Sequence, residues 1–211
     1  MFDSSLRSVL EAPLRAVAVA VDRPWITPDR LTIAGLVLGL GSAATAATQL
    51  WWWSLALWLL SRVFDGVDGA LARLRRSRAT RAEAKRSEAG GFLDIVSDFT
   101  VYGFTVFGVG IGATAGFNAP WWPFVLVLVA YYLNGAAFLA FSSIAERTNR
   151  QIDDGRSLSF LGRIAEGTET ILVHSLWLIF PVIAGPIAVV WAIVVGVSAA
   201  QRMIVGYRAL R

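Results

Sequence analysis

Four aspartates occupy two short apolar segments on either side of a basic stretch. Asp65 and Asp68 lie three residues apart, and Asp94 and Asp98 lie four apart. In helices, these spacings place each pair on one face. In an antiparallel hairpin the inner carboxylates, of Asp68 and Asp94, would lie ~6 to 8 Å below the connecting loop and the outer ones ~12 Å below it. The two pairs can therefore face each other at matched depths.

The chemistry of such a cluster points to a bound cation. Buried carboxylates without partners are costly, and four at similar depth call for a compensating positive charge. The chain has no cysteine and one histidine, so oxygen ligation is expected, which suits Mg2+, Mn2+ or Ca2+ and argues against zinc. Gly66 and Gly69 flank Asp68 and leave room for another helix or a ligand. Arg73, near the mouth of the site, can hold a phosphate.

The two segments resemble the signature of the CDP-alcohol phosphotransferase family, Asp-x-x-Asp-Gly-x-x-Ala-Arg followed by Gly-x-x-x-Asp-x-x-x-Asp. Every defining position is filled, by Asp65, Asp68, Gly69, Ala72, Arg73, Gly90, Asp94 and Asp98. The connection departs from the family, which usually has about eight residues between the arginine and the second glycine. Residues 74–89 number 16 here. This difference predicts an extended loop or extra helical turns.

The resemblance implies a CDP-linked alcohol donor, attack by an acceptor hydroxyl on the phosphorus nearest that alcohol, and release of CMP. It also implies a pair of Mg2+ or Mn2+ ions at the site and a homodimer. Asp65, Asp68 and Asp94 would bind metal, and Asp98 would be the catalytic base and also touch a metal. By the same resemblance, the positions expected to bind the CDP part are Thr32, Gly66, Gly69, Ala72, Arg73 and Gly90. The stretch from Thr27 to Thr32 is similar to a family pattern before the first span, with Asp29 where asparagine is usual.

Composition places the chain among membrane proteins. Hydrophobic residues make up 56% of the 211 residues, and the mean hydropathy is +0.60. Six stretches approach the ~20 residues that a bilayer core requires: residues 31–49, 50–73, 90–113, 121–145, 164–183 and 186–209. We therefore predict an all-α membrane protein with six transmembrane helices. It would form one domain over residues 1–211, with a juxtamembrane segment (1–29) and a six-helix bundle (30–211).

The distribution of charge predicts the orientation. Lys and Arg gather before the first stretch, between the second and third, between the fourth and fifth, and at the end of the chain. By the positive-inside rule, both termini and the acidic site would face the cytoplasm, in the inner or plasma membrane if the protein is bacterial. Residues 2–22 are expected to form an amphipathic helix on the membrane surface. Tryptophans at 51–53 and 121–122 fit an interfacial belt, with an aromatic substrate cage as the alternative.

Other charged residues have less specific patterns. The basic residues between positions 75 and 86 suit anionic lipid headgroups, and they lack the interleaved aromatic residues typical of nucleic-acid binding. Arg62, one turn before Asp65, is interpreted as balancing charge. His174 lies alone in an apolar run, which favours a packing role over metal ligation.

The acceptor is less defined. Arg163 with Arg202 would favour a phosphorylated polyol such as glycerol 3-phosphate or inositol phosphate. Glu166 and Glu169 would equally suit an amine such as serine, or sugar hydroxyls. A purely structural alternative is an ion pair between Arg163 and Glu166, with Arg202 reaching the interface.

The leading functional hypothesis is phosphatidyl transfer from CDP-diacylglycerol to a small polar alcohol, because a compact six-span chain resembles the CDP-diacylglycerol users of the family. One alternative is transfer of a phospho-aminoalcohol from CDP-choline or CDP-ethanolamine to a lipid hydroxyl. An alternative of another class is a membrane transporter that binds cations without transferase chemistry. The expected partners of the phosphatidyltransferase are the CDP-linked lipid, the alcohol and membrane lipids, and not nucleic acid.

Overall fold

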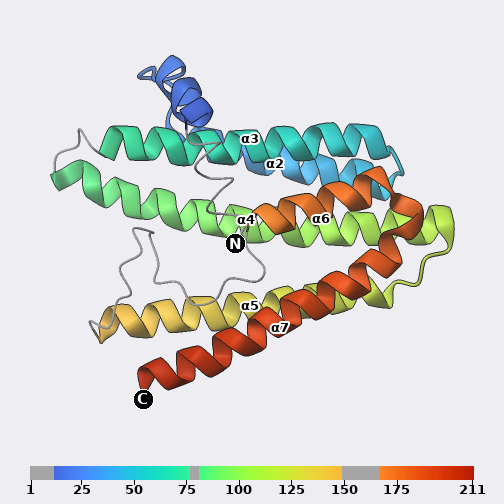
Figure 1. Cartoon of the computed structure of the whole chain (residues 1–211). Coiled ribbons are helices and arrows are strands. Elements are labelled where there is room, and N and C mark those ends of the chain that lie inside the picture. The colour runs from blue at the N-terminus through green and yellow to red at the C-terminus, as the bar shows by residue number, and fades with distance from the viewer. Residues whose placement is uncertain (1–11, 77–80, 149–166) are drawn as a thin grey trace.

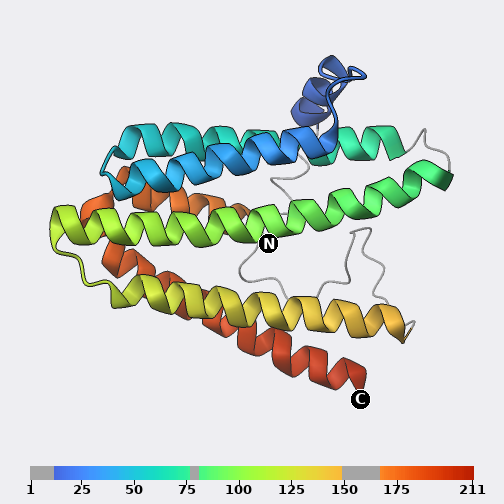
Figure 2. The ribbon, with the colours of Figure 1, turned by 180° about the vertical axis from the view of Figure 1, so that it is seen from behind.

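The structure, a computed structural model, describes residues 12–76, 81–148 and 167–211. Its elements are α2 (Pro28–Ala47), α3 (Trp51–Arg76), α4 (Arg81–Phe117), α5 (Trp122–Arg147), α6 (Gly167–Ile179), the short 3-10 helix η1 (Pro181–Ile183) and α7 (Ala184–Leu210). Residues 12–20 form a further helix. The long helices run roughly along one axis, and the N-terminal helix is set at an angle to them (Figures 1 and 2). The all-α prediction is confirmed for the described residues.

Membrane-spanning character is evident in part of the bundle. Among the described residues, four segments are long and apolar enough to cross a membrane: Pro28–Ala47, Glu88–Phe117, Trp122–Arg147 and Pro181–Leu210. Helix α3 has 26 residues but carries Arg62, Asp65 and Asp68 in its middle. Helix α6 has 13 residues, fewer than the ~20 needed to span, and the predicted start of this segment at residue 164 lies outside the described residues. The total of six spans stays a prediction.

Helix α2 is the element on which the acidic helices are assembled. It packs extensively against both α3 and α4, whereas α3 and α4 contact each other little. Helices α5 and α7 form a second extensive pair, and α6 packs mainly on α3. The local sequence explains where α2 begins. Pro28 occupies the first turn of the helix, and the side chain of Thr27 caps the helix by accepting a hydrogen bond from the amide of Arg30.

Small polar side chains join α2 to α3. The hydroxyl of Ser42 donates to the carbonyl of Ser54 at 2.8 Å, and the hydroxyl of Ser54 donates back to the carbonyl of Ser42 at 2.8 Å. Further along, the hydroxyl of Ser61 donates to the carbonyl of Gly35 at 2.7 Å. All three serines are fully buried. Small residues allow close approach of membrane helices and polar ones fix their register, so these contacts set the axial position of α3.

Glycines on α4 allow equally close contact with the other side of α2. A Cβ atom added at Gly108 would lie 2.2 Å from the carbonyl oxygen of Ala43, and one at Gly112 would lie 2.1 Å from that of Ala46. These spacings of four residues match the small-xxx-small pattern of packed membrane helices. The backbones of α2 and α4 therefore touch directly.

We expect Gly112→Ala to destabilise the fold. The added methyl group would overlap the carbonyl oxygen of Ala46, and overpacking of this kind costs about 1 to 3 kcal/mol. Gly103→Ala on the same helix is the matched control, because nothing lies within 4 Å of its added Cβ. Thermal unfolding in detergent should show a lower melting temperature for Gly112→Ala only. Equal melting temperatures for the two variants would contradict the tight α2–α4 contact.

The two ends of the bundle differ in composition. The C-terminal ends of α3, α5 and α7 and the N-terminal end of α4 lie together, on the left in Figure 1. Basic residues in the last turns at this end are Arg73, Arg75, Arg76, Arg147 and Arg208. Near the opposite end, Trp52, Trp53 and Trp121 are 72%, 68% and 66% exposed. Outward-facing tryptophans favour the interfacial belt over a substrate cage.

The N-terminal helix packs on α3. Ala18 joins Ala70 and Leu71 in a small apolar cluster, with Leu14 packed against it. Just beyond the helix, one carboxylate oxygen of Asp22 accepts hydrogen bonds from Nε and Nη2 of Arg75 at 2.9 and 2.7 Å. Of the amphipathic helix predicted for residues 2–22, the part before residue 12 lies outside the described residues. The described part is held against the same helix that carries the first half of the signature.

Candidate active site

The structure brings the two aspartate pairs together between α3 and α4. Asp65 interacts electrostatically with each of the other three aspartates, and Asp68 interacts with both Asp94 and Asp98. Because α3 and α4 both rest on α2 and scarcely touch each other, the carboxylates lie between the helices. The helical spacing predicted this arrangement.

Asp68 is the most buried of the four, with 3% of its surface exposed. The hydroxyl of Thr32, on α2, donates a hydrogen bond to its Oδ2 at 2.6 Å. Thr32 was predicted to contact the CDP part. In the structure its hydroxyl lies 2.6 Å from Oδ2 of Asp68 and 3.1 Å from the carbonyl oxygen of Pro28, so it can orient this carboxylate, and contact with the CDP part stays a prediction.

Arg62 is a central member of the cluster. Its Nη1 lies 2.7 Å from Oδ1 of Asp98 and 3.7 Å from Oδ1 of Asp65, and its side chain is 6% exposed. The guanidinium lies over the rings of Trp58 and Tyr102, at 5.1 Å from each ring centre. The sequence interpretation gave Arg62 only charge balance. The missed signal was helical spacing, since Trp58 and Tyr102 stand one turn from Arg62 and Asp98.

The donor chemistry of the cluster fits a hard divalent cation, because all four groups are carboxylates on facing helices. Within the described residues, however, no three acidic or histidine side chains converge into a ready ligand set. The guanidinium of Arg62 forms ion pairs with the carboxylates of Asp65 and Asp98. Four like charges repel unless positive charge lies among them, and the guanidinium groups of Arg62 and Arg73 supply part of it.

The small residues of the signature have different neighbours. At Gly69, an added Cβ would lie 3.3 Å from Nη1 of Arg73, so this guanidinium folds back over the glycine. At Gly90, an added Cβ would lie 3.0 Å from Oδ1 of Asp29. The missing side chain of Gly66 faces Leu14 of the N-terminal helix, at 3.1 Å from the added Cβ. The glycines were expected to leave room for another helix or for a ligand. At Gly66 the neighbour is a helix, whereas at Gly69 it is the guanidinium of Arg73, the residue expected to bind phosphate.

The remaining signature positions sit at the same end of α3. Ala72 is half-buried and Arg73 is exposed. Arg73 also interacts electrostatically with Asp94 on α4. The exposed guanidinium therefore stands at the edge of the acidic cluster, where a phosphate could approach it.

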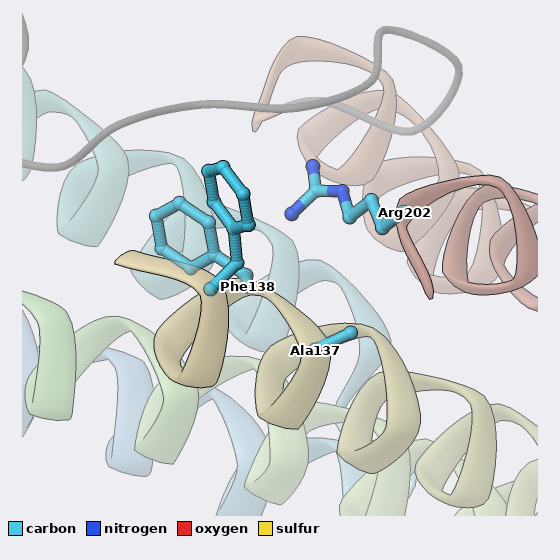
Figure 3. A pocket seen from close by; sticks show the side chains of 4 residues that line it. Ala137, Phe138 and Arg202 are labelled. Carbon is cyan, nitrogen blue, oxygen red and sulfur yellow. The ribbon is translucent and has the colours of Figure 1, made fainter. Parts of the chain in front are cut away.

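The predicted acceptor residues are only partly visible. Arg202 on α7 is 8% exposed, and its guanidinium carbon lies 5.4 Å from the ring centre of Phe138 on α5. Figure 3 shows this guanidinium facing a small hollow beside Ala137 and Phe138. The hollow is too small to admit a water molecule as it stands. Glu169 is half-buried on α6, and Arg163 and Glu166 lie outside the described residues.

His174 is a buried packing residue, as the apolar run around it indicated. Its ring lies 4.8 Å from that of Trp58 and 4.9 Å from that of Trp177, and its Nε2 is 2.9 Å from the hydroxyl of Tyr131. Trp191 donates to the same hydroxyl at 2.7 Å. These contacts connect α3, α5, α6 and α7 behind the acidic cluster.

Comparison with known proteins agrees with the signature. The model of the CDP-alcohol phosphatidyltransferase family matches residues 25–200, which include both halves of the acidic motif. The chain belongs to this family. The CDP-alcohol phosphatidyltransferases are enzymes, so the chain is identified with an enzyme class and not with a class of transporters.

Several relatives are similar over much of the chain. The Inner membrane protein YnjF of Escherichia coli (strain K12) is 36% identical over 186 residues, covering 86% of this chain and 83% of that protein. The archaetidylinositol phosphate synthase of Pyrococcus horikoshii is 28% identical over 154 residues, covering 71% and 78%. Together with the apolar helices, these similarities support an integral membrane phosphatidyltransferase-family protein.

A solved structure shares the fold. The crystal structure of the Mycobacterium tuberculosis phosphatidylinositol phosphate synthase with CDP-DAG bound aligns with a TM-score of 0.54 at 19% identity, covering 93% of this chain and 91% of that one. At this identity the similarity establishes the helical architecture alone.

Proposed function

We propose that this protein transfers a phosphatidyl group from CDP-diacylglycerol to the hydroxyl of a small polar alcohol and releases CMP. The observation that carries the proposal is the cluster of four carboxylates between two helices of a membrane bundle, with Arg73 at its edge. A reaction between a lipid and a water-soluble alcohol requires a site that both can reach. The family relative solved with CDP-DAG supports this choice of donor. We expect the site to face the cytoplasm and the enzyme to be a homodimer.

The proposed reaction is a single transfer step. The acceptor oxygen attacks the phosphorus next to the diacylglycerol, a new P–O bond forms, and the bond to CMP breaks with its electron pair leaving on CMP. The carboxylate of Asp98, which is 32% exposed, accepts the proton of the acceptor hydroxyl. Arg73 binds a diphosphate oxygen, and Gly69 leaves space for the nucleotide beside the helix.

Metal binding is expected at the same cluster. Asp65, Asp68, Asp94 and Asp98 would hold Mg2+ or Mn2+, which supplies neutralisation of the diphosphate charge and polarisation of the phosphoryl oxygens. Charge counting supports a pair of ions. The four carboxylates outnumber the guanidinium groups of Arg62 and Arg73 that lie beside them, so a divalent ion would be attracted to the free site. The diphosphate of the donor adds negative charge that a second ion would balance.

For the acceptor we propose a phosphorylated polyol, such as glycerol 3-phosphate or an inositol phosphate. Arg202 is a buried cation on α7, in the half of this helix nearer the basic end of the bundle, and its guanidinium carbon lies 5.4 Å from the ring centre of Phe138. A buried guanidinium suits a phosphate better than a neutral alcohol. The archaetidylinositol phosphate synthase among the relatives is consistent with this acceptor class.

The deciding experiment is CMP release by the purified protein. CDP-diacylglycerol would be supplied with Mg2+ or Mn2+ and a panel of acceptors: glycerol 3-phosphate, inositol phosphate, inositol and serine. We expect CMP with a phosphorylated polyol. Release only from CDP-choline or CDP-ethanolamine with diacylglycerol would instead support phospho-aminoalcohol transfer. No CMP with any pair would contradict the proposal and favour cation transport.

We expect Arg202→Gln to raise the KM for a phosphorylated acceptor by about tenfold or more, because a hydrogen bond to a charged group contributes about 1.5 to 3 kcal/mol. The KM for the CDP-linked donor should not change. Arg208→Gln, which removes an exposed arginine from the same helix, is the control and should leave both constants near wild type. Equal effects of Arg202→Gln on phosphorylated and unphosphorylated acceptors would contradict phosphate recognition.

A further inference from the structure

Arg62 connects the outer carboxylates of the two acidic helices. Its Nη1 donates a hydrogen bond to Oδ1 of Asp98 at 2.7 Å, and the same nitrogen is 3.7 Å from Oδ1 of Asp65. A charge-assisted hydrogen bond of this length is strong and directional. One nitrogen on α3 therefore defines where one oxygen of Asp98 on α4 lies.

The guanidinium itself has little freedom to move. The rings of Trp58 and Tyr102 both lie 5.1 Å from its carbon. Nη1 also donates to the Tyr102 hydroxyl at 3.3 Å, and Nη2 donates to Oγ of Ser61 at 3.1 Å. Ser61 is in turn hydrogen-bonded to the carbonyl of Gly35 on α2. Contacts from α2, α3 and α4 thus fix both terminal nitrogens.

We propose that Arg62 is a positioning residue that holds Asp98 by its Oδ1 and presents Oδ2 to the acceptor hydroxyl. The inference rests on the proposed function, in which Asp98 accepts the proton. The terminal torsion of a carboxylate is broad, so a carboxylate without such a partner samples many orientations. Lysine cannot replace the arginine fully, because an ammonium group is a point charge without the planar fork that reaches Asp98, Tyr102 and Ser61 together.

Kinetics of Arg62→Gln in the full-length protein test this role. A misplaced general base slows turnover by about a hundredfold, so we expect kcat to fall by that order with little change in the KM of either substrate. Arg75→Gln is the matched control, because it removes an arginine of the same helix whose Nη2 is 2.7 Å from Asp22. Its kcat should stay near wild type. A wild-type kcat in Arg62→Gln would overturn the proposal.

Chemical rescue separates positioning from general structural support. Arg62→Ala opens a space between the rings of Trp58 and Tyr102 that a small guanidinium ion can fill. We expect guanidinium or ethylguanidinium, below denaturing concentration, to restore part of kcat with saturation, and to have no effect on Asp98→Asn. Arg62→Lys should recover part of the activity. A folded Arg62→Ala protein that no guanidinium ion activates would overturn the proposal.

A readout without turnover keeps this inference distinct from the proposed function. Thermal unfolding of Arg62→Gln, Asp98→Asn and the double variant forms a cycle in which directly paired residues are non-additive. Additive losses would overturn the pairing even in an active enzyme. If the wild type releases no CMP, the proposed function fails while the cycle still decides whether the pair exists. Should Arg62→Gln not fold, Arg62→Lys keeps the positive charge without the planar fork, and a wild-type kcat there would overturn the proposal.

Discussion

Asp98→Asn is expected to lower kcat by about a thousandfold, since general base catalysis contributes 10²- to 10⁴-fold. The amide has nearly the shape of the carboxylate but cannot take the acceptor proton. Binding of CDP should persist, because Gly69 and Arg73 lie elsewhere in the site. CMP release measured under saturating donor and acceptor gives kcat, and calorimetric titration with CDP gives the affinity.

The controls for Asp98→Asn use another paired carboxylate. Asp22 accepts hydrogen bonds from Arg75 much as Asp98 does from Arg62, but it lies beyond the N-terminal helix and outside the acidic cluster. Asp22→Asn should keep near-wild-type turnover. Substantial activity in purified, folded Asp98→Asn would remove Asp98 from the role of base and leave the carboxylate as a metal or structural group.

Removal of divalent ions is expected to reduce CMP release by at least about a hundredfold, since such ions contribute several kcal/mol of charge stabilisation in phosphoryl-type transfer. Dialysis against a chelator followed by Mg2+ or Mn2+ should restore the rate. Zinc should restore it poorly, because the cluster offers oxygen ligands only. Full turnover after exhaustive chelation would contradict the metal-dependent mechanism.

Metal binding can also be measured without turnover. An ion that binds only the folded state raises the unfolding free energy by about 2.7 kcal/mol at a hundred times its dissociation constant. Mn2+ should therefore raise the melting temperature of the chelated wild type. Asp68→Asn should lose most of this rise, and Asp22→Asn should keep it. Identical shifts in all three proteins would place the ion outside the acidic cluster.

The pairing of the aspartates within each helix could be predicted from the sequence, because helical spacing decides which side chains share a face. Asp65 and Asp68, and likewise Asp94 and Asp98, share a face in any helix, and the two segments are close in the chain. Four membrane spans could also be predicted, because their length and apolar composition are evident in the sequence. The predicted boundaries of α2, α5 and α7 agree with the structure to within three residues, whereas α4 begins at Arg81, nine residues before the predicted start at residue 90.

Contacts between helices distant in sequence could not be predicted in this way. Nothing in the spacing of Thr32 says that its hydroxyl meets Asp68, because that contact depends on the axial position of α2 along α3. The same applies to Leu14, which fills the space over Gly66. Arg62 has its partners one turn away on α3 and across the site on α4, so only the assembled bundle reveals that it bonds Asp98.

Helix α2 has a consequence for how this enzyme can vary in evolution. It lies between the two acidic helices with almost no side-chain padding: Gly35 and Ser61 on one side, and Ala43 and Gly108 on the other, bring backbone against backbone. The diameter of α2 therefore sets the distance between α3 and α4, and with it the distance between the two aspartate pairs. Bulkier residues at these small positions of α2 would move α3 and α4 apart. We therefore expect substitutions that reduce activity to occur in α2 as well as in the acidic motif.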